Sequence, residues 1–309
     1  MMHSAVSVLD PPVTPRLSFP ALPYGPAARP AVPTNGSREV VPGRKATAGS
    51  FVVEPGRPVR LDLSEGDAVV FGRGAALVDV PGRLQELIDP LCAVWCRAGY
   101  TLHWSSFAGA RTRLDWFTPA ALSAVLDSHV PGRGERHDEL PYRIYYASPG
   151  LFLTQHLAVG PRQAPASPRL VADALDFRPM EFSASAWSRL FSPARGGAHE
   201  LVRAVRKELW LSYRSLVSVP EVARRVGYSS AHLSRIFKRN TGLSILAYCH
   251  ELRMRAALDL LEAGELDLGE LALELGYATH SHFTGRFKRT FGITPSRYQR
   301  LSESPRSSR

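Results

Sequence analysis

The hydrophobic residues between positions 51 and 159 fall in short runs, several of which alternate with polar residues as half-buried β-strands do. Expected strands cover residues 59–63, 68–71, 75–80, 101–104, 111–117, 142–146 and 151–159. Apolar residues recur at helical spacing from Leu84 to Trp95, which predicts an amphipathic helix. Thr118 followed by Pro119 is typical of a cap and first turn, here for a helix at 120–127. The pattern predicts a strand-rich α+β domain.

From residue 199 onward the apolar spacing is helical. One helix is expected at 199–213 and a long one at 244–262. On either side of the long helix lies one copy of a repeated pattern. The copies read SVPEVARRVGYSSAHLSRIFKRNTG from Ser218 and DLGELALELGYATHSHFTGRFKRTFG from Asp267. A self-match of this length indicates a duplicated structural unit.

Each copy predicts two short helices separated by a glycine turn. Ser218 with Glu221, and Asp267 with Glu270, are spaced as capping boxes that open the first helix. That helix ends at a glycine, which suits the left-handed C-terminal position. The first helices of the two copies are expected to end at Gly227 and Gly276. The second helices are expected to begin after Ser229 or Ser230 and after Thr279, and to end at Gly242 and Gly292. Thr294-Pro295 is expected to begin a last helix.

Two helices around a glycine turn, the second with a basic outer face, form the helix-turn-helix arrangement that places its second helix in the major groove. A single copy would equally suit a purely structural α-hairpin. Here the second helix of each copy contains Phe-Lys-Arg, at 237–239 and again at 287–289. Two copies with the same basic ending favour a nucleic-acid-binding function.

The residues LSRIFKRNTGLS and LGELALELGYATHSHFTGRFKRTFGITPSRY resemble the DNA-binding domain of AraC/XylS-type transcription regulators over about residues 199–301. The resemblance implies seven helices, with two helix-turn-helix subdomains joined by the long helix. It also implies recognition helices in successive major-groove segments of double-stranded DNA. An N-terminal domain, often a β-rich barrel, senses an effector or dimerises in this family. The strands and two helices at 51–190 suit an open α/β arrangement equally well, and a protein-partner module is the alternative role.

The family's base-reading positions fall on Ala231, Ser234, Arg235, His280, Ser281, Thr284 and Gly285. The residues expected at the DNA backbone are Ser230, Lys238, Arg239, Lys288 and Arg289. Gly285 stands where the family usually has an arginine, and it aligns with Arg235 of the first copy. Because glycine has no side chain to reach a base, we expect Arg235 to make most of the base-specific hydrogen bonds.

Charge supports this interpretation. The chain carries a net charge of +10. Residues 199–309 contain 18 lysines and arginines against 11 acidic residues, a net +7, whereas residues 51–198 contain 15 of each. The excess positive charge therefore lies on the repeated region, as expected for a domain that binds a polyanion.

No enzyme signature is present in the sequence. Cys92, Cys96 and Cys249 give no disulfide framework, and Cys92 and Cys96 lack the second pair of a zinc site, so we expect buried cysteines on a helix face. There is neither a phosphate-binding glycine loop nor a nucleophile elbow. We expect no catalytic residue, metal or cofactor. A DNA-repair enzyme fused to a regulator is the rival, and it would need a reactive Cys92 or Cys96.

We therefore expect a multidomain chain. Its expected parts are a disordered proline-rich arm at 1–50, a strand-rich sensory or dimerisation domain at 51–190, an all-α DNA-binding domain at 199–301 and a disordered tail at 302–309. The start of the chain resembles no signal peptide and no run is long enough to span a bilayer, which predicts a cytoplasmic protein. The expected function is sequence-specific transcription regulation, as an activator. The expected partners are DNA, RNA polymerase and either an effector or a second copy.

Overall fold

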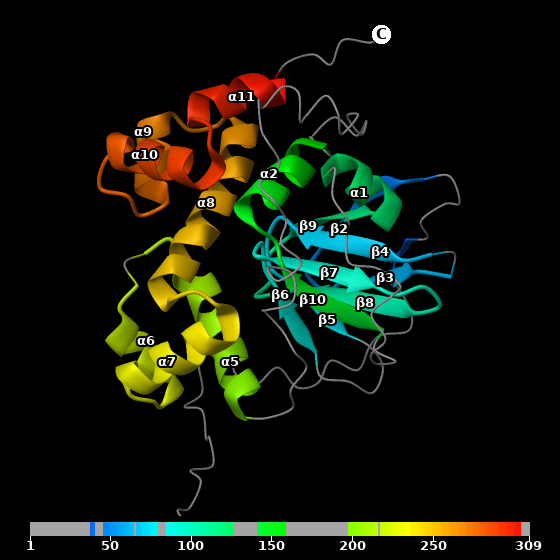
Figure 1. The fold of residues 1–309 in the computed structure, drawn as a ribbon, viewed down its shortest axis with the longest axis horizontal. Helices are drawn as coiled ribbons and strands as arrows, with labels where there is room; N and C mark the ends of the chain where they lie inside the picture. Colours follow the sequence, from blue (N-terminus) through cyan, green and yellow to red (C-terminus); the bar gives the residue numbers. More distant parts are fainter. Residues whose placement is uncertain are drawn as a thin grey trace, which may run out of the picture. The chain divides into compact units, whose positions relative to one another are not determined.

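The structure, a computed structural model, describes residues 38–40, 46–64, 66–79, 85–126, 141–158, 197–215 and 217–303. The β-rich part, up to residue 158, consists of β1 (Arg38–Val40), β2 (Ala48–Val53), β3 (Val59–Asp62), β4 (Ala68–Gly72), β5 (Ala76–Asp79), β6 (Glu86–Ile88), β7 (Cys92–Cys96), β8 (Thr101–Ser106), β9 (Thr112–Phe117), α1 (Pro119–Leu126), β10 (Tyr142–Tyr146) and α2 (Pro149–Ala158). The helical part consists of α5 (Gly197–Ser212), α6 (Val219–Val226), α7 (Ser230–Thr241), α8 (Ile245–Ala263), α9 (Leu268–Glu274), α10 (His280–Phe291) and α11 (Pro295–Glu303). The predicted fold class is confirmed (Figure 1).

The strands of the β-rich part form two five-stranded sheets, ordered β1-β3-β8-β5-β6 and β10-β7-β4-β9-β2. Neighbouring strands are antiparallel, apart from the parallel pair β1 and β3. One buried apolar cluster takes residues from both sheets, among them Leu61 and Trp104 from the first and Val70 and Trp116 from the second. Two sheets that share a core form a β-sandwich, which decides against the open α/β arrangement.

The second sheet is covered on both faces. Val70 and Val94 point into the sandwich, whereas their neighbours Val69 and Ala93 pack with residues of α1 and α2 on the outer face. Because side chains alternate across a strand, a strand that is covered on both faces is apolar at every position. This explains why residues 68–71 form a continuous apolar run, and why all of β4 is buried.

Two predicted elements of the β-rich part are wrong. Residues 84–95 do not form a helix, because Asp89-Pro90 separates β6 in one sheet from β7 in the other. Proline is unfavourable inside a helix, and its predecessor avoids helical geometry. Residues 151–159 are not a strand, because α2 occupies Pro149–Ala158. Its cap is the Ser148 hydroxyl, which accepts from the Leu151 N–H at 3.2 Å.

The predicted arm at 1–50 extends too far. Strand β1 lies at Arg38–Val40, and β2 begins at Ala48 and pairs with β9 along its whole length. Pairing with a distant strand orders a segment whose own composition favours disorder. Positions 1–37 and 41–45 of the arm lie outside the described residues, as do positions 304–309 of the predicted tail, whose first two positions belong to α11.

The helical part contains the seven expected helices between residues 197 and 303, where only residue 216 is not described. Asp267 and Glu270 form the expected capping box of α9. The corresponding box at Ser218 is wrong, since the Ser218 side chain makes no capping hydrogen bond. Pro220, at the second helical position, has no N–H to offer, and Glu221 instead accepts from Arg225 at 2.5 Å. Among the described helices, none combines the length and the apolar character needed to cross a lipid bilayer.

Candidate nucleic-acid interface

Helix α7 separates a buried face from an exposed one. Leu233, Phe237 and Thr241 are buried. The three expected base-reading residues, Ala231, Ser234 and Arg235, are all exposed. Residues three and four apart share a helix face, so these side chains lie together on the outer surface of α7. Ser229 caps the helix, since its hydroxyl accepts from the His232 N–H at 3.4 Å, which decides between Ser229 and Ser230.

Helix α10 repeats this division with aromatic residues on the inside. Phe283, Phe287 and Phe291 are buried, and the Phe287 and Phe291 ring centroids are 4.8 Å apart. Of the expected base-reading residues, His280, Ser281 and Gly285 are exposed and Thr284 is partly buried. The Thr279 hydroxyl accepts from the His282 N–H at 3.2 Å and caps the helix. Both helices therefore present the predicted residues outward.

The backbone-contact candidates lie at matching places of α7 and α10. Lys238 and Arg239 are exposed in the last turn of α7, and Lys288 and Arg289 are exposed in the last turn of α10. Ser230 is the first residue of α7. Lysine and arginine at such places suit sequence-independent phosphate contacts, which position a protein on the duplex.

Arg235 has a partner on its own helix. Its Nη2 lies 3.4 Å from Nδ1 of His232, and because arginine has only donors, His232 must accept. The His232 ring stacks on Tyr228, with ring centroids 5.3 Å apart and planes 4° apart. A stacked imidazole that accepts from Arg235 restricts where the guanidinium lies.

The corresponding residues of the second copy are arranged differently. His282 meets Tyr277 edge-on, with planes 88° apart. Gly285 takes the place of the arginine, and a Cβ built there would meet nothing within 4 Å. No steric requirement for glycine is visible at this position. On the outer surface, Thr284 Oγ1 and His280 Nε2 are 3.1 Å apart, so these two side chains contact one another.

Two titratable groups behind α10, His250 and Tyr277, are held neutral. Burial, reinforced by Arg286, Arg253 and His282, lowers the pKa of His250 below its ordinary value. Burial also raises the pKa of Tyr277 to about 12. His250 and Tyr277 are therefore both uncharged at neutral pH, and the charge behind α10 comes from arginines such as Arg253.

Buried polar contacts that no sequence pattern indicated bind the β-rich part to the helical part. Asp89, between β6 and β7, is fully buried. Its Oδ2 accepts from Arg206 Nη2 of α5 at 2.9 Å and from the Tyr248 hydroxyl of α8 at 2.6 Å. Arg206 also donates to the Leu87 carbonyl at 3.0 Å. A buried arginine and aspartate with several hydrogen bonds form a charge-assisted contact.

A second missed contact surrounds Arg73, which follows β4. Its guanidinium donates to Asp115 Oδ2 at 2.7 Å, to Glu262 Oε2 at 2.7 Å and to His156 Nε2 at 2.9 Å. Burial alone would raise the pKa of Glu262, but His156, Arg73 and Arg113 outweigh it and hold the pKa at about 2. Glu262 is therefore ionised at neutral pH and pairs with Arg73.

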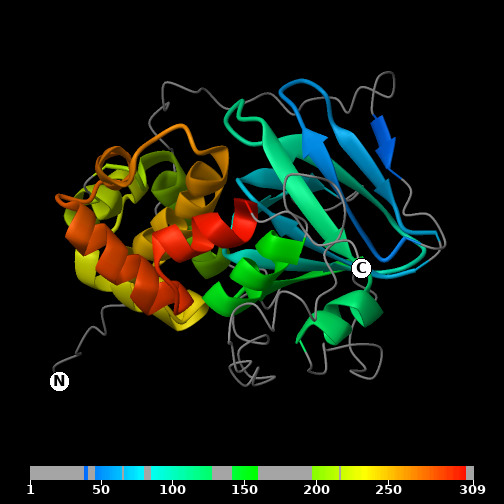
Figure 2. The ribbon, with the colours of Figure 1, turned by 90° about the horizontal axis from the view of Figure 1, so that it is seen from above.

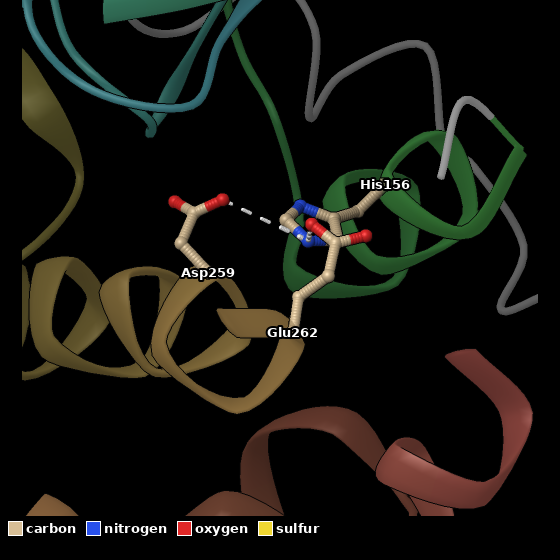
Figure 3. Close-up of side chains that lie close together, drawn as sticks. All are labelled: His156, Asp259 and Glu262. Carbon is tan, nitrogen blue, oxygen red and sulfur yellow. Dashed lines mark ion pairs between the residues drawn. The ribbon is translucent and has the colours of Figure 1, made fainter. Parts of the chain in front are cut away.

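Figure 3 shows His156, Asp259 and Glu262 pointing toward one another, with candidate metal-ligand atoms within 4.8 Å of each other. A metal ion does not fit these residues. Nη1 of Arg73 already lies at hydrogen-bond distance from both His156 Nε2 and Glu262 Oε2. The guanidinium thus supplies the positive charge that a cation would bring. We assign the cluster to contact between the two parts of the chain.

All three cysteines are buried as expected, but Cys92 and Cys96 lie on strand β7 and not on a helix face, whereas Cys249 lies on helix α8. Burial raises the pKa of Cys92 to about 12 and that of Cys96 well above its ordinary value. Since the thiolate is the reactive form, neither residue suits the nucleophile of a repair enzyme.

Comparison with known proteins identifies the helical part. The family described as "Helix-turn-helix domain" matches residues 222–301. The Tn10 TetD protein of Escherichia coli is 33% identical over 95 residues, which are 30% of this chain and 68% of the relative. The chain belongs to the AraC/XylS family of transcription regulators. The matched region is the DNA-binding domain of this family.

Two further similarities cover the same region. The HTH-type transcriptional regulator GlxA of Rhizobium meliloti is 32% identical over 120 residues, which are 37% of each chain. The solved C-terminal domain of AraT, a response regulator from Geobacillus stearothermophilus, is 27% identical and covers 37% of this chain and 95% of that one, with a TM-score of 0.34. The chain spans little more than a third of the length of GlxA, so the similarity concerns the DNA-binding domain.

Proposed function

We propose that this AraC/XylS-family regulator reads two successive major-groove segments on one face of DNA, and that the two recognition helices contribute unequally. α7 reads bases mainly through Arg235. α10 contributes through His280, Ser281 and Thr284 and holds the protein on the backbone. The observation that carries this proposal is the exposed position of all the predicted base-reading residues except Thr284, which is partly buried, on two capped helices.

Dimensions support simultaneous engagement of both helices. α8, which joins the two helix-turn-helix units, has 19 residues and is about 28 Å long at 1.5 Å per residue. The major groove returns to the same face of DNA after about 34 Å. A rigid connector of this length suits two helices that enter neighbouring groove segments.

Binding-site selection from random DNA with the full chain, followed by footprinting, tests the proposal. We expect a site with two base-specific elements about one helical turn apart, of which one is the more sharply defined. Arg235→Ala should relax the sharper element. A selected site with a single element, or no enrichment of any sequence, would refute two-segment reading.

For the remainder of the chain we propose the role that the family implies. The β-rich part acts as an effector-sensing or dimerising domain, and DNA-bound protein activates transcription by contacting RNA polymerase. The alternative is a β-rich part that binds another protein. A promoter reporter with and without the regulator, repeated with candidate metabolites, distinguishes activation from repression and tests whether an effector acts. Sedimentation of the full chain tests dimerisation.

A further inference from the structure

One face of α8 contacts the β-rich part along its whole length. The four polar side chains on this face are Tyr248, Arg255, Asp259 and Glu262. Their separations of seven, four and three residues place them on one side of an α-helix. These polar residues lie among buried apolar residues of α8, and each of them interacts with a group of the β-rich part.

The contact at the N-terminal end of α8 also includes the first helix-turn-helix. The Tyr248 hydroxyl donates to Asp89, and the Tyr248 ring lies edge-on to Phe237 of α7, with centroids 5.3 Å apart. Arg206 of α5 donates to the same carboxylate. A single side chain of the β-rich part, Asp89, therefore anchors both α5 and α8, against which α7 packs.

The middle of α8 is held by Arg255, which is fully buried. Its Nη2 donates to the Ala147 carbonyl at 2.5 Å, and its guanidinium lies over the rings of Tyr146 and Phe152. These residues lie on β10, at the start of α2 and in the turn between them, so the contact continues from one end of the β-rich part toward the other.

At the C-terminal end of α8, Arg73 pairs with Glu262 and with Asp259, and His156 of α2 packs on Tyr298 of α11 with ring centroids 6.0 Å apart. The apolar residues of α2 continue this contact, because Phe152, Leu153 and Leu157 belong to the core of the helical part. α2 packs against both α8 and the recognition helix α10. Figure 1 and Figure 2 show α2, in green, beside α8 and the sheet.

We propose that Arg73 and Asp89 are positioning residues for DNA recognition. By holding α8 at its two ends, the β-rich part sets the distance and angle between α7 and α10, and with them the operator spacing that the protein accepts. The inference depends on the proposed two-segment reading. In addition, residues of the β-rich part determine which spacing between the two operator elements the protein accepts, so this preference is a property of the full chain. The competing source of spacing lies within the helical part, where Arg253 donates to the Tyr213 and Ser215 carbonyls.

The test compares full-length variants on the selected operator with its native spacing and with one base pair inserted or removed between the elements. Arg73→Gln removes the guanidinium, and Glu262→Gln is the milder change, since its amide oxygen still accepts from Arg73. Arg60→Gln, an exposed arginine on β3, is the matched control. For each variant, the readout is the dissociation constant for the altered spacing divided by that for the native spacing. Both constants are measured on one protein preparation, so the fraction of folded protein cancels from the ratio.

We expect the wild type and Arg60→Gln to disfavour the altered spacing, and both cluster variants to lose about fivefold or more of that preference, in the range typical of coupling between sites. The double variant with both Arg73→Gln and Glu262→Gln, which leaves the net charge unchanged, should lose as much of this preference as Arg73→Gln alone. Both substitutions break the same contact, so their effects should not add. Unchanged ratios in Arg73→Gln and Glu262→Gln, or a wild type that tolerates every spacing, would overturn the inference. If the wild type showed no sequence-specific binding to any of these operators, the proposed function itself would be refuted.

Discussion

The two helix-turn-helix copies share a sequence pattern but differ in how each is built. The first has an uncapped entry at Ser218, a turn glycine with free space around it and an arginine on its reading face. The second has a complete capping box, a turn glycine against backbone and a glycine on its reading face. The first copy thus has the arginine on its outer surface, whereas the second copy has the complete cap and the tighter packing at its turn.

The largest expected difference between the copies is the cost in folding stability of replacing the turn glycine, Gly276 or Gly227, by alanine. Both have positive φ, 73° and 78° respectively, but a Cβ at Gly276 would lie 2.5 Å from the Arg214 carbonyl, whereas Gly227 has nothing within 4 Å. We expect Gly276→Ala to lower the free energy of unfolding by about 2–4 kcal/mol, from strain and overpacking together. Gly227→Ala should cost about 1–2 kcal/mol from strain alone. Chemical denaturation measures both, and equal costs would contradict the packing argument.

Arg235 gives the next largest effect, and it acts on binding. We expect Arg235→Ala to cost about 1–3 kcal/mol of specific binding and to relax one base position. Its counterpart Gly285→Ala should leave the base preference of the second element as it is. Competition binding against operators with single base changes measures both. Undiminished discrimination by Arg235→Ala would remove the proposed asymmetry.

The same comparison shows what the sequence predicted and why. Cap residues, turn glycines and apolar spacing act within a few residues, so α7 and α10 and their outward faces followed from the sequence. Both wrong predictions, the helix at 84–95 and the strand at 151–159, involve a proline: Pro90 separates two strands, and Pro149 begins α2. Both prolines were local signals that favour the observed structure.

Other features had no local signal. Arg73 and Glu262 are 189 residues apart, and neither has a neighbour in the sequence that indicates its partner. The sole indication was on α8, where Arg255, Asp259 and Glu262 continue the face begun by Tyr248. Polar residues on a helix face that packs against another part of the chain require partners there, but their spacing does not identify them.

His232 offers a smaller test of the asymmetry. His232→Phe keeps a flat ring against Tyr228 and removes the acceptor for Arg235. One net hydrogen bond of about 1 kcal/mol corresponds to a loss of about fivefold in specific affinity. The loss should vanish when Arg235 is already alanine, and His282→Phe, whose copy has Gly285 in place of the arginine, should have no such effect. A loss that persists in the Arg235→Ala background would show that His232 acts by another route.

The smallest expected effect concerns the stability of α10. Gly285 lies inside the helix in open space and without positive φ, so the backbone needs no glycine there. We expect Gly285→Ala to raise the free energy of unfolding by about 0.5–1 kcal/mol, because alanine loses less conformational entropy in a helix. Denaturation with and without the selected operator measures the change. If stability rises while DNA affinity falls, the close approach of the backbone to DNA is what requires glycine, and α10 then reads its segment by shape.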